Sequence, residues 1–344
     1  MDRRAFLART GVVAGIGGLA GCSSVSGLGG GDESLGLAFQ APAETVDVNT
    51  WYAADGVIAE HGGDALEPGV FEGVDLAVQS VLSGDNDVAR GSVTAAAALA
   101  DSGQEFRFVA APIRATDYVL VAREGIDSLE AIVEQEATIG MSAPTALDAV
   151  QTAALLFEEG IIDDVDELDF QRVGTSGTRM SAIQEGSIDV SPQHFAQWRV
   201  LREEDDSLRR LATFGDRLDS WVQETYMAPA SVIEERREEL TEFLAAQIVA
   251  NRRLYGDYER YAGLVDDHVD GGGPEASVLE ASYEFLTEVG VWPEDGGLAR
   301  ENVDYMLDLS NRLGLTEERI PTGEILERGP LEDALDRVGT PGGA

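Results

Sequence analysis

Lysine is absent from this sequence, and cysteine and histidine are nearly absent. The 344 residues include 24 basic side chains, every one an arginine, together with one cysteine and three histidines. A single cysteine excludes an internal disulfide, and a chain without lysine cannot supply the phosphate-binding lysine of a Walker loop. His61, His194 and His268 are not spaced with one another or with the cysteine as metal ligands, so no metal site is expected.

Positive charge is also scarce. The 64 acidic residues give a formal net charge of -40, while a hydrophobic share of 44% is enough for a folded core. Exposed carboxylates hydrate a protein and repel its neighbours, and salt screens that repulsion, with a Debye length of roughly 3 Å at 1 M. Together with the missing lysine, this indicates a halophile of haloarchaeal type. Binding of nucleic acid or of an anionic membrane through a basic surface is excluded.

The first part of the chain has the features of an export signal. Arg3-Arg4 with Phe6-Leu7 behind it resembles a twin-arginine signal. The apolar run 11–20 is shorter than the roughly twenty residues that span a bilayer. Leu19-Ala20-Gly21-Cys22 resembles a lipobox, which predicts lipidation at Cys22. We therefore expect a signal over 1–22 and a Ser/Gly-rich flexible tether over 23–33.

From Leu35 onward, short apolar runs alternate with longer helical patterns, which predicts α/β architecture. After residue 231 only helical patterns remain, and Gly290 and Gly314 close the last two. The expected strands are 35–39, 87–90, 106–110, 118–122, 137–141, 168–173, 188–190 and 211–214. The expected helices are 94–100, 146–159, 180–185, 231–255, 275–289 and 300–313.

A weak internal repeat is the most informative feature. Gly84-x-x-Asp87-Val88 is echoed by Gly186-x-x-Asp189-Val190, and each copy follows a helical stretch that ends near an aliphatic residue. Mechanically, this pattern predicts a glycine that ends a helix in the left-handed conformation, then a strand entered through aspartate. Two such passages, each followed by a polar loop, suggest two similar lobes.

The order of these motifs resembles the type II periplasmic substrate-binding proteins of ABC importers, in the nitrate, sulfonate and thiamine-precursor group. Besides the repeat, the resemblance rests on Phe108–Pro112 leading to Asp117–Arg123, on Gly125-Ile126-Asp127-Ser128-Leu129, and on Asn302–Leu307. It covers nearly the whole exported chain. The Lys-Gly-Lys turn usual before the second-lobe strand is absent, and Val133–Glu136 stands in its place.

The resemblance implies a two-lobed α/β fold with a helical C-terminal portion. Lobe 1 would comprise 34–117 plus 214–339, lobe 2 would comprise 118–213, and a small solute would bind between them. The resemblance further implies no catalysis and no cofactor, a membrane permease and its ATPase as partners, and a location on the outer face of the cell membrane.

Candidate ligand contacts lie on the loops beyond the carboxyl ends of the strands, where helix starts present free N–H groups. Ordinary roles compete with binding: Ser92 and Thr94 can cap a helix, and tryptophans are more often core anchors. The run 140–144 imitates a nucleophile elbow but has proline at the closing position. The expected ligand-binding residues are Gln40, Trp51, Ser92, Thr94, Arg114, Ser142, Thr145, Thr175, Ser176, Gln193, His194 and Trp221.

The hydroxyl-rich loops and Arg114 favour a small anion as the solute. The resemblance allows nitrate, a sulfonate such as taurine, bicarbonate, or a thiamine-related pyrimidine. Two alternatives stay open. A sensory lipoprotein would present the same features, and an enzyme like the thiamine-pyrimidine synthases shares the fold. The enzyme is disfavoured because that group needs a cysteine-rich iron motif and an active lysine, which this chain lacks.

Overall fold

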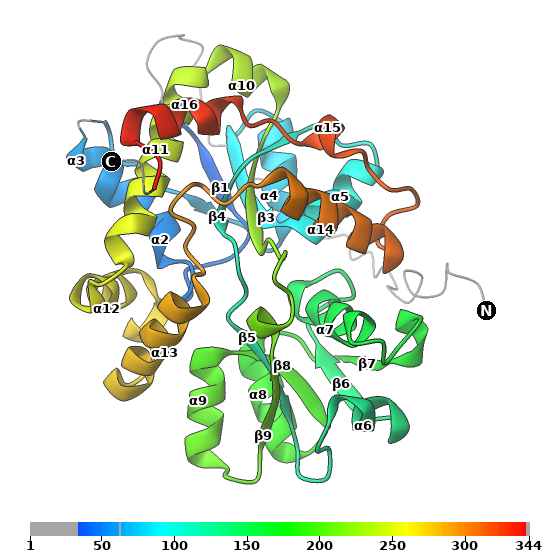
Figure 1. Ribbon diagram of the computed structural model, residues 1–344. Helices are drawn as coiled ribbons and strands as arrows, with labels where there is room; N and C mark the ends of the chain where they lie inside the picture. The colour runs from blue at the N-terminus through cyan, green and yellow to red at the C-terminus, as the bar shows by residue number, and fades with distance from the viewer. Residues whose placement is uncertain (1–33, 62, 342–344) are drawn as a thin grey trace, which may run out of the picture.

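The computed structural model describes residues 34–61 and 63–341. It contains two five-stranded sheets, each flanked by helices, in two lobes that meet where the chain crosses between them (Figure 1). This confirms the expected two-lobed α/β class. The predicted signal and tether, with Cys22, lie outside the described residues. Within the described part of the chain, no helix combines the length and the apolar character needed to cross a bilayer.

The first sheet has the strand order β2-β1-β3-β10-β4. Its strands are β1 (Leu37–Phe39), β2 (Gly69–Val70), β3 (Val88–Ser92), β4 (Arg107–Ile113) and β10 (Glu224–Ala228). The first three are parallel, whereas β10 runs antiparallel to both β3 and β4. The strand prediction missed β2 and β10. All five residues of β10 are buried, so it has no alternation of apolar and polar positions to reveal a strand.

The second sheet has the order β7-β6-β8-β5-β9. Its strands are β5 (Tyr118–Ala122), β6 (Thr138–Met141), β7 (Asp169–Arg172), β8 (Val190–His194) and β9 (Arg209–Thr213). The strand expected at 188–190 lies further along, because Pro192 and its polar neighbours indicated a turn. β8 pairs with the parallel strand β6 at Val190, so Pro192 lies beyond that pairing.

The helices flank both sheets and then form the C-terminal portion (Figure 1). The expected helix over 231–255 is two helices, since Arg236 has non-helical backbone angles and separates them. Gly290 and Gly314 have φ of 71° and 72°, as predicted for helix ends. The principal helices are α2 (Val48–Trp51), α4 (Val74–Leu82), α5 (Val93–Asp101), α6 (Leu129–Glu134), α7 (Leu147–Glu158), α8 (Ser176–Glu185), α9 (Phe195–Glu204), α10 (Ala230–Glu235), α11 (Arg237–Leu254), α12 (Tyr258–His268), α13 (Ala276–Val289), α14 (Arg300–Arg312), α15 (Thr322–Ile325) and α16 (Gly329–Val338).

The internal repeat has the same structural role in each lobe. Gly84 and Gly186 both have positive φ, 83° and 75°. The carboxylate of Asp87 accepts a hydrogen bond of 2.7 Å from the backbone N–H of Gly36, just before β1. Asp189 accepts one of 3.0 Å from Thr138 at the start of β6. In each lobe the aspartate therefore fixes its strand against the neighbouring parallel strand.

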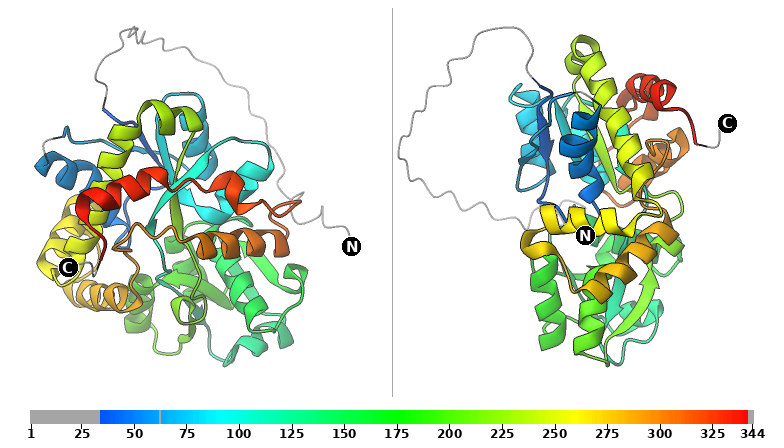
Figure 2. Two further views of the ribbon diagram at one scale, coloured as in Figure 1. Left: turned by 45° about the horizontal axis from the view of Figure 1, so that its top comes forward. Right: turned by 90° about the vertical axis from the view of Figure 1, so that its left-hand side faces the viewer.

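The C-terminal helices contact both lobes. In Figure 2, α13 lies beside the second lobe, and the ring of Phe285 on α13 stacks on Phe195 of α9 with 4.0 Å between centroids. Arg312 at the end of α14 forms an ion pair of 3.2 Å with Glu158 of α7. The part of the chain after β10 therefore connects the lobes in addition to the two crossing segments, the first between β4 and β5 and the second between β9 and β10.

Candidate functional site

The lobes meet at the carboxyl ends of parallel strands. In open α/β sheets this is the edge where loops and helix starts bind ligands. The loop after β1 carries Glu44, whose Oε2 lies 2.9 Å from Nε2 of His194 at the end of β8. We call the side chains around this contact, on the loops after β1, β3, β6 and β8, the interlobe site.

On the first lobe, a buried arginine organises the site. Arg90 on β3 is completely buried, and its Nη1 donates to Asp47 and to Thr50, each at 2.8 Å. Its Nε lies 3.4 Å from a carboxylate oxygen of Glu224, and its guanidinium covers the ring of Phe39. Burial raises the pKa of Asp47 to about 6, against the opposing effect of Arg90. Arg90 thereby joins the loop after β1 to the start of β10.

Gln40 connects three segments on the same side. Its Nε2 donates to Glu224 at 2.6 Å, and its Oε1 accepts from the backbone N–H of Ser92 at 3.2 Å. Ser92 precedes α5, yet its hydroxyl makes no capping hydrogen bond, so the simple capping role is not observed. Thr94 is fully buried, and its hydroxyl has no hydrogen-bond partner.

On the second lobe, a buried ion pair positions the loops of the interlobe site. Asp148 on α7 accepts from the backbone N–H and the hydroxyl of Ser142, at 2.8 and 2.9 Å. It also pairs with Arg179 Nη1 at 2.7 Å, with both side chains 2% exposed. Arg179 donates in addition to the carbonyls of Gly174 and Pro192. One arginine therefore fixes the loops after β6 and β7 to the carboxyl-terminal end of β8.

His194 is held between two carboxylates. Its Nδ1 lies 2.9 Å from Asp117, at the end of the first crossing segment, and its Nε2 faces Glu44 of the other lobe. Burial opposes the charged imidazolium, but Asp117 and Glu44 raise the pKa of His194 well above 6.5. In turn, the charge of His194 lowers the pKa of Glu44. At neutral pH the two groups form a charged contact between the lobes.

The structure brings together some of the expected residues and not others. Gln40, Ser92, Thr94, Ser142, Gln193 and His194 lie at the strand ends that form the interlobe site. Thr145 follows Ser142 on the same loop, and Thr175 and Ser176 begin α8, where the Thr175 hydroxyl accepts from the N–H of Thr178. Arg114 does not join this group. It is exposed, and its guanidinium donates to the Gly290 carbonyl at the end of α13.

The two tryptophans have different surroundings. Trp51 stacks on His268 with 5.9 Å between centroids and meets Phe39 edge-on. Trp221 lies fully buried in the core, on the second crossing segment. The indole N–H of each is buried without a hydrogen-bond partner. Since buried polar groups are normally paired, a bound solute can supply partners for atoms such as these.

Sequence reasoning missed the buried charges of the site. These are Asp47, Asp117, Asp148, Arg179 and Glu224. Glu44, whose side chain is 46% exposed, was missed as well. One signal was present. Arg90 and Asp148 are isolated charges within apolar runs, and charged residues are almost never fully buried unless paired. An isolated charge in an apolar run indicates that the side chain is buried. It does not identify the ion-pair partner, because that partner lies on a different helix, strand or loop.

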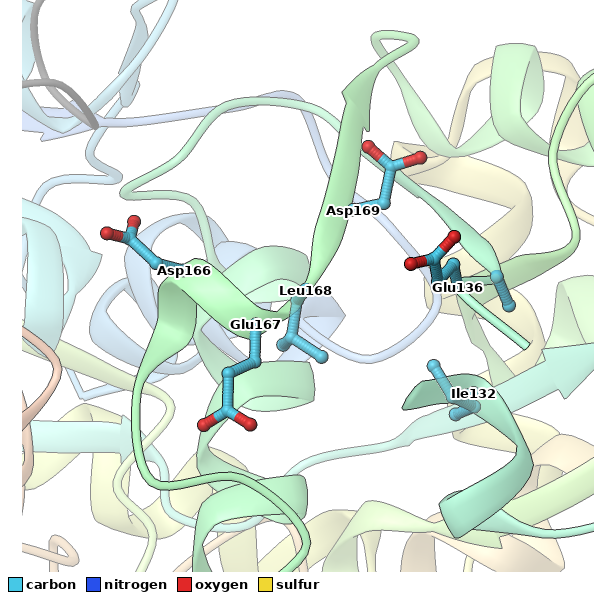
Figure 3. A pocket seen from close by; sticks show the side chains of 7 residues that line it. Ile132, Glu136, Asp166, Glu167, Leu168 and Asp169 are labelled. Carbon is cyan, nitrogen blue, oxygen red and sulfur yellow. The ribbon is translucent and has the colours of Figure 1, made fainter. Parts of the chain in front are cut away.

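A separate recess lies on the second lobe, away from the interlobe site. It has a volume of 370 Å³ and is lined by Ile132, Ala137, Leu168 and four carboxylates (Figure 3). Ala137 and Asp169 stand at the amino ends of β6 and β7, opposite the edge where α/β sheets bind ligands. Among the described residues, no group of three or more His, Cys, Asp or Glu side chains is arranged to hold a metal.

Comparison with known proteins identifies the fold. No protein-family model matches the sequence, and no curated protein matches it. A putative periplasmic sulfonate-binding protein, SsuA, from Methylobacillus flagellatus KT superposes with a TM-score of 0.70 at 14% identity, covering 90% of this chain and 96% of that one. A zinc-bound ligand-binding component of an ABC-type import system from Staphylococcus aureus also scores 0.70, at 12% identity, covering 88% and 99%. The nitrate-binding protein NrtA from Synechocystis PCC 6803 scores 0.66 at 11% identity, covering 90% and 89%. The fold is therefore that of the two-lobed type II periplasmic binding proteins.

Proposed function

We propose that this protein is an extracytoplasmic solute-binding lipoprotein of an ABC importer. It captures a small anionic solute between its lobes, performs no chemistry on it, and delivers it to a permease that works with a separate ATPase. The observation that carries the proposal is the interlobe site itself. Loops from both sheets meet there at the Glu44–His194 contact, and Thr94 and Gln193 contribute buried polar atoms without partners.

The mechanism is closure of the lobes about the two crossing segments. A solute that contacts both lobes favours the closed state by the difference between its affinities for the closed and open states. Lobe 1 comprises 34–117 plus 214–339, and lobe 2 comprises 118–213. The crossing segments carry a buried network in which the Thr116 hydroxyl donates to Gln151, and Gln151 donates to Gln223. This network fixes both crossing segments against α7.

The candidate contacts with solute come from both sides of the site. Gln40, Ser92 and Thr94 belong to lobe 1, and Ser142, Thr145, Thr175, Ser176, Gln193 and His194 belong to lobe 2. Trp51 and Trp221 offer buried indole N–H donors. Arg114 is not among the proposed contacts, because its guanidinium is directed at α13. Hydroxyl and N–H donors of this kind suit an oxyanion such as nitrate or a sulfonate.

Export and anchoring complete the proposal. The twin-arginine pattern at Arg3-Arg4 and the lipobox before Cys22 support export and attachment to the outer face of the membrane through lipid. A flexible tether over 23–33 would hold the lobes away from the membrane surface.

Small-angle scattering of the full chain in multimolar KCl tests the proposed closure. Calorimetry first identifies which of nitrate, taurine, bicarbonate, methanesulfonate and an aminopyrimidine bind. A solute that binds should reduce the radius of gyration below that of the solute-free protein. Binding that leaves the radius of gyration unchanged would contradict lobe closure.

A further inference from the structure

We infer that the carboxylate of Glu44 occupies the position of the solute's anionic group and competes with the solute for His194. This inference rests on the proposed function and deepens it, because it identifies the solute as a monoanion. It also assigns Glu44 as the residue that sets affinity.

The geometry of Glu44 suits a tethered competitor. Its carboxylate reaches across from lobe 1 to His194 of lobe 2 at 2.9 Å, yet its side chain is 46% exposed, whereas that of His194 is 11% exposed. Glu44 can therefore withdraw into water at small cost. The imidazolium cannot follow, since its other nitrogen is held by the buried carboxylate of Asp117.

The cations around the Glu44 carboxylate are fixed. His194 Nε2 lies 2.9 Å from the Glu44 carboxylate and lowers the pKa of Glu44 most, while Arg179 and Arg90 also favour its charged form. Each is also paired with another carboxylate: Asp117 with His194, Asp148 with Arg179, and Asp47 and Glu224 with Arg90. Withdrawal of Glu44 therefore leaves three cationic side chains that are already held in position, so an incoming anion requires little reorganisation of them.

The charge balance selects a monoanion. Without Glu44, the three cations His194, Arg179 and Arg90 face the four carboxylates Asp117, Asp148, Asp47 and Glu224, which leaves a net charge of -1. With Glu44 in place the net charge is -2. A monoanion that replaces Glu44 restores that value, whereas a dianion adds a further negative charge in a poorly hydrated site.

An independent observation also indicates a ligand. The Thr94 hydroxyl and Nη2 of Arg90 are buried without hydrogen-bond partners, and both side chains are 0% exposed. Both atoms can donate to an oxyanion. Glu44 does not satisfy them, since its carboxylate contacts Nε2 of His194.

Two other roles for Glu44 predict different outcomes. If Glu44 binds a cationic group of the solute, removal of its charge should weaken binding. If the Glu44–His194 contact is only a latch that holds the lobes together, its removal should weaken the binding of every solute. Competition alone predicts tighter binding of monoanions when Glu44 loses its charge.

The test compares Glu44→Gln with the wild-type full chain by calorimetry at one fixed KCl concentration. The matched control is Glu67→Gln, which removes the same charge from an exposed position of lobe 1. The probes are methanesulfonate and nitrate as monoanions, sulfate as a dianion and methylammonium as a cation. We expect Glu44→Gln to bind the monoanions roughly fivefold more tightly, the factor given by loss of one half-exposed ion pair, with no change in Glu67→Gln.

Unchanged or weaker monoanion binding in Glu44→Gln would overturn the inference, as would the absence of monoanion binding to both proteins. Tighter binding of methylammonium than of methanesulfonate to the wild type would also overturn it. The proposed function is judged separately, because it stands if any other solute closes the lobes in the scattering experiment. Melting curves of both variants verify that they are folded.

Discussion

Arg179 and Asp148 form an ion pair of 2.7 Å in which each side chain is 2% exposed. The pair has no counterpart among the expected site residues, although it supports several of them. Asp148 fixes Ser142 through two hydrogen bonds. Arg179 donates to the backbone carbonyls of Gly174, after β7, and of Pro192, on β8. The loops of the second lobe are therefore positioned by buried charge rather than by their own turn chemistry.

Replacement of Arg179 by methionine should destabilise the protein strongly. It leaves Asp148 buried without its cation, a change that typically costs about 3–5 kcal/mol. Denaturant unfolding at fixed salt measures the free energy of unfolding. Arg209→Met is the matched control, since Arg209 pairs with Asp127 at the surface and both side chains are more than half exposed. Equal losses in the two variants would show that burial does not determine the contribution.

Replacement of either repeated aspartate by alanine should destabilise the protein. Each variant leaves a backbone N–H at a strand start without its partner, a loss of about 1–3 kcal/mol. Asp87→Ala should cost more than Asp189→Ala, because the ion pair of Asp87 with Arg236 is less exposed than that of Asp189 with Arg123. The double variant should be additive, as the two sites lie in different lobes. Melting curves test both points, and a large non-additive term would contradict independent roles.

Stability should fall as the pH rises above neutrality. The folded-state pKa of His194 is raised above 6.5, so its contribution is fully present below that pH and is lost as the pH rises through the folded value. The charged groups that face it are Asp117 and Glu44, while burial raises the pKa of Tyr118 to about 12 and keeps that ring neutral.

Melting temperatures from pH 6.5 to about 9 measure this loss. Asp47 does not interfere, because its own contribution is lost at lower pH, as the pH rises from 3.8 through about 6. In His194→Gln the melting temperature should change less over the same range. An identical fall in the variant would assign the pH dependence to other groups.

The fold was predictable wherever local pattern and burial agree. The strand at 118–122 matches β5 because a continuous apolar run is bounded by polar residues. β10 was not predictable, since it is a central strand that begins with the charged residue Glu224. The contacts of Glu224, a hydrogen bond from Gln40 and an ion pair with Arg90, come from distant segments. The loops at Ser92, Ser142 and His194 could be predicted because ligands bind beyond the carboxyl ends of strands in α/β sheets. Glu44 was missed, because nothing in the sequence around it shows that its side chain reaches the other lobe.

The measurement that tests the central claim most directly is the melting temperature with and without a bound solute, in the wild type and in two variants. A solute that binds between the lobes should stabilise the wild type by about 2.7 kcal/mol at a hundredfold excess over its Kd. That shift should be lost in His194→Gln and retained in Glu136→Gln, which alters only the recess on the second lobe. A shift that persists in His194→Gln and disappears in Glu136→Gln would place the solute in the recess and contradict binding between the lobes.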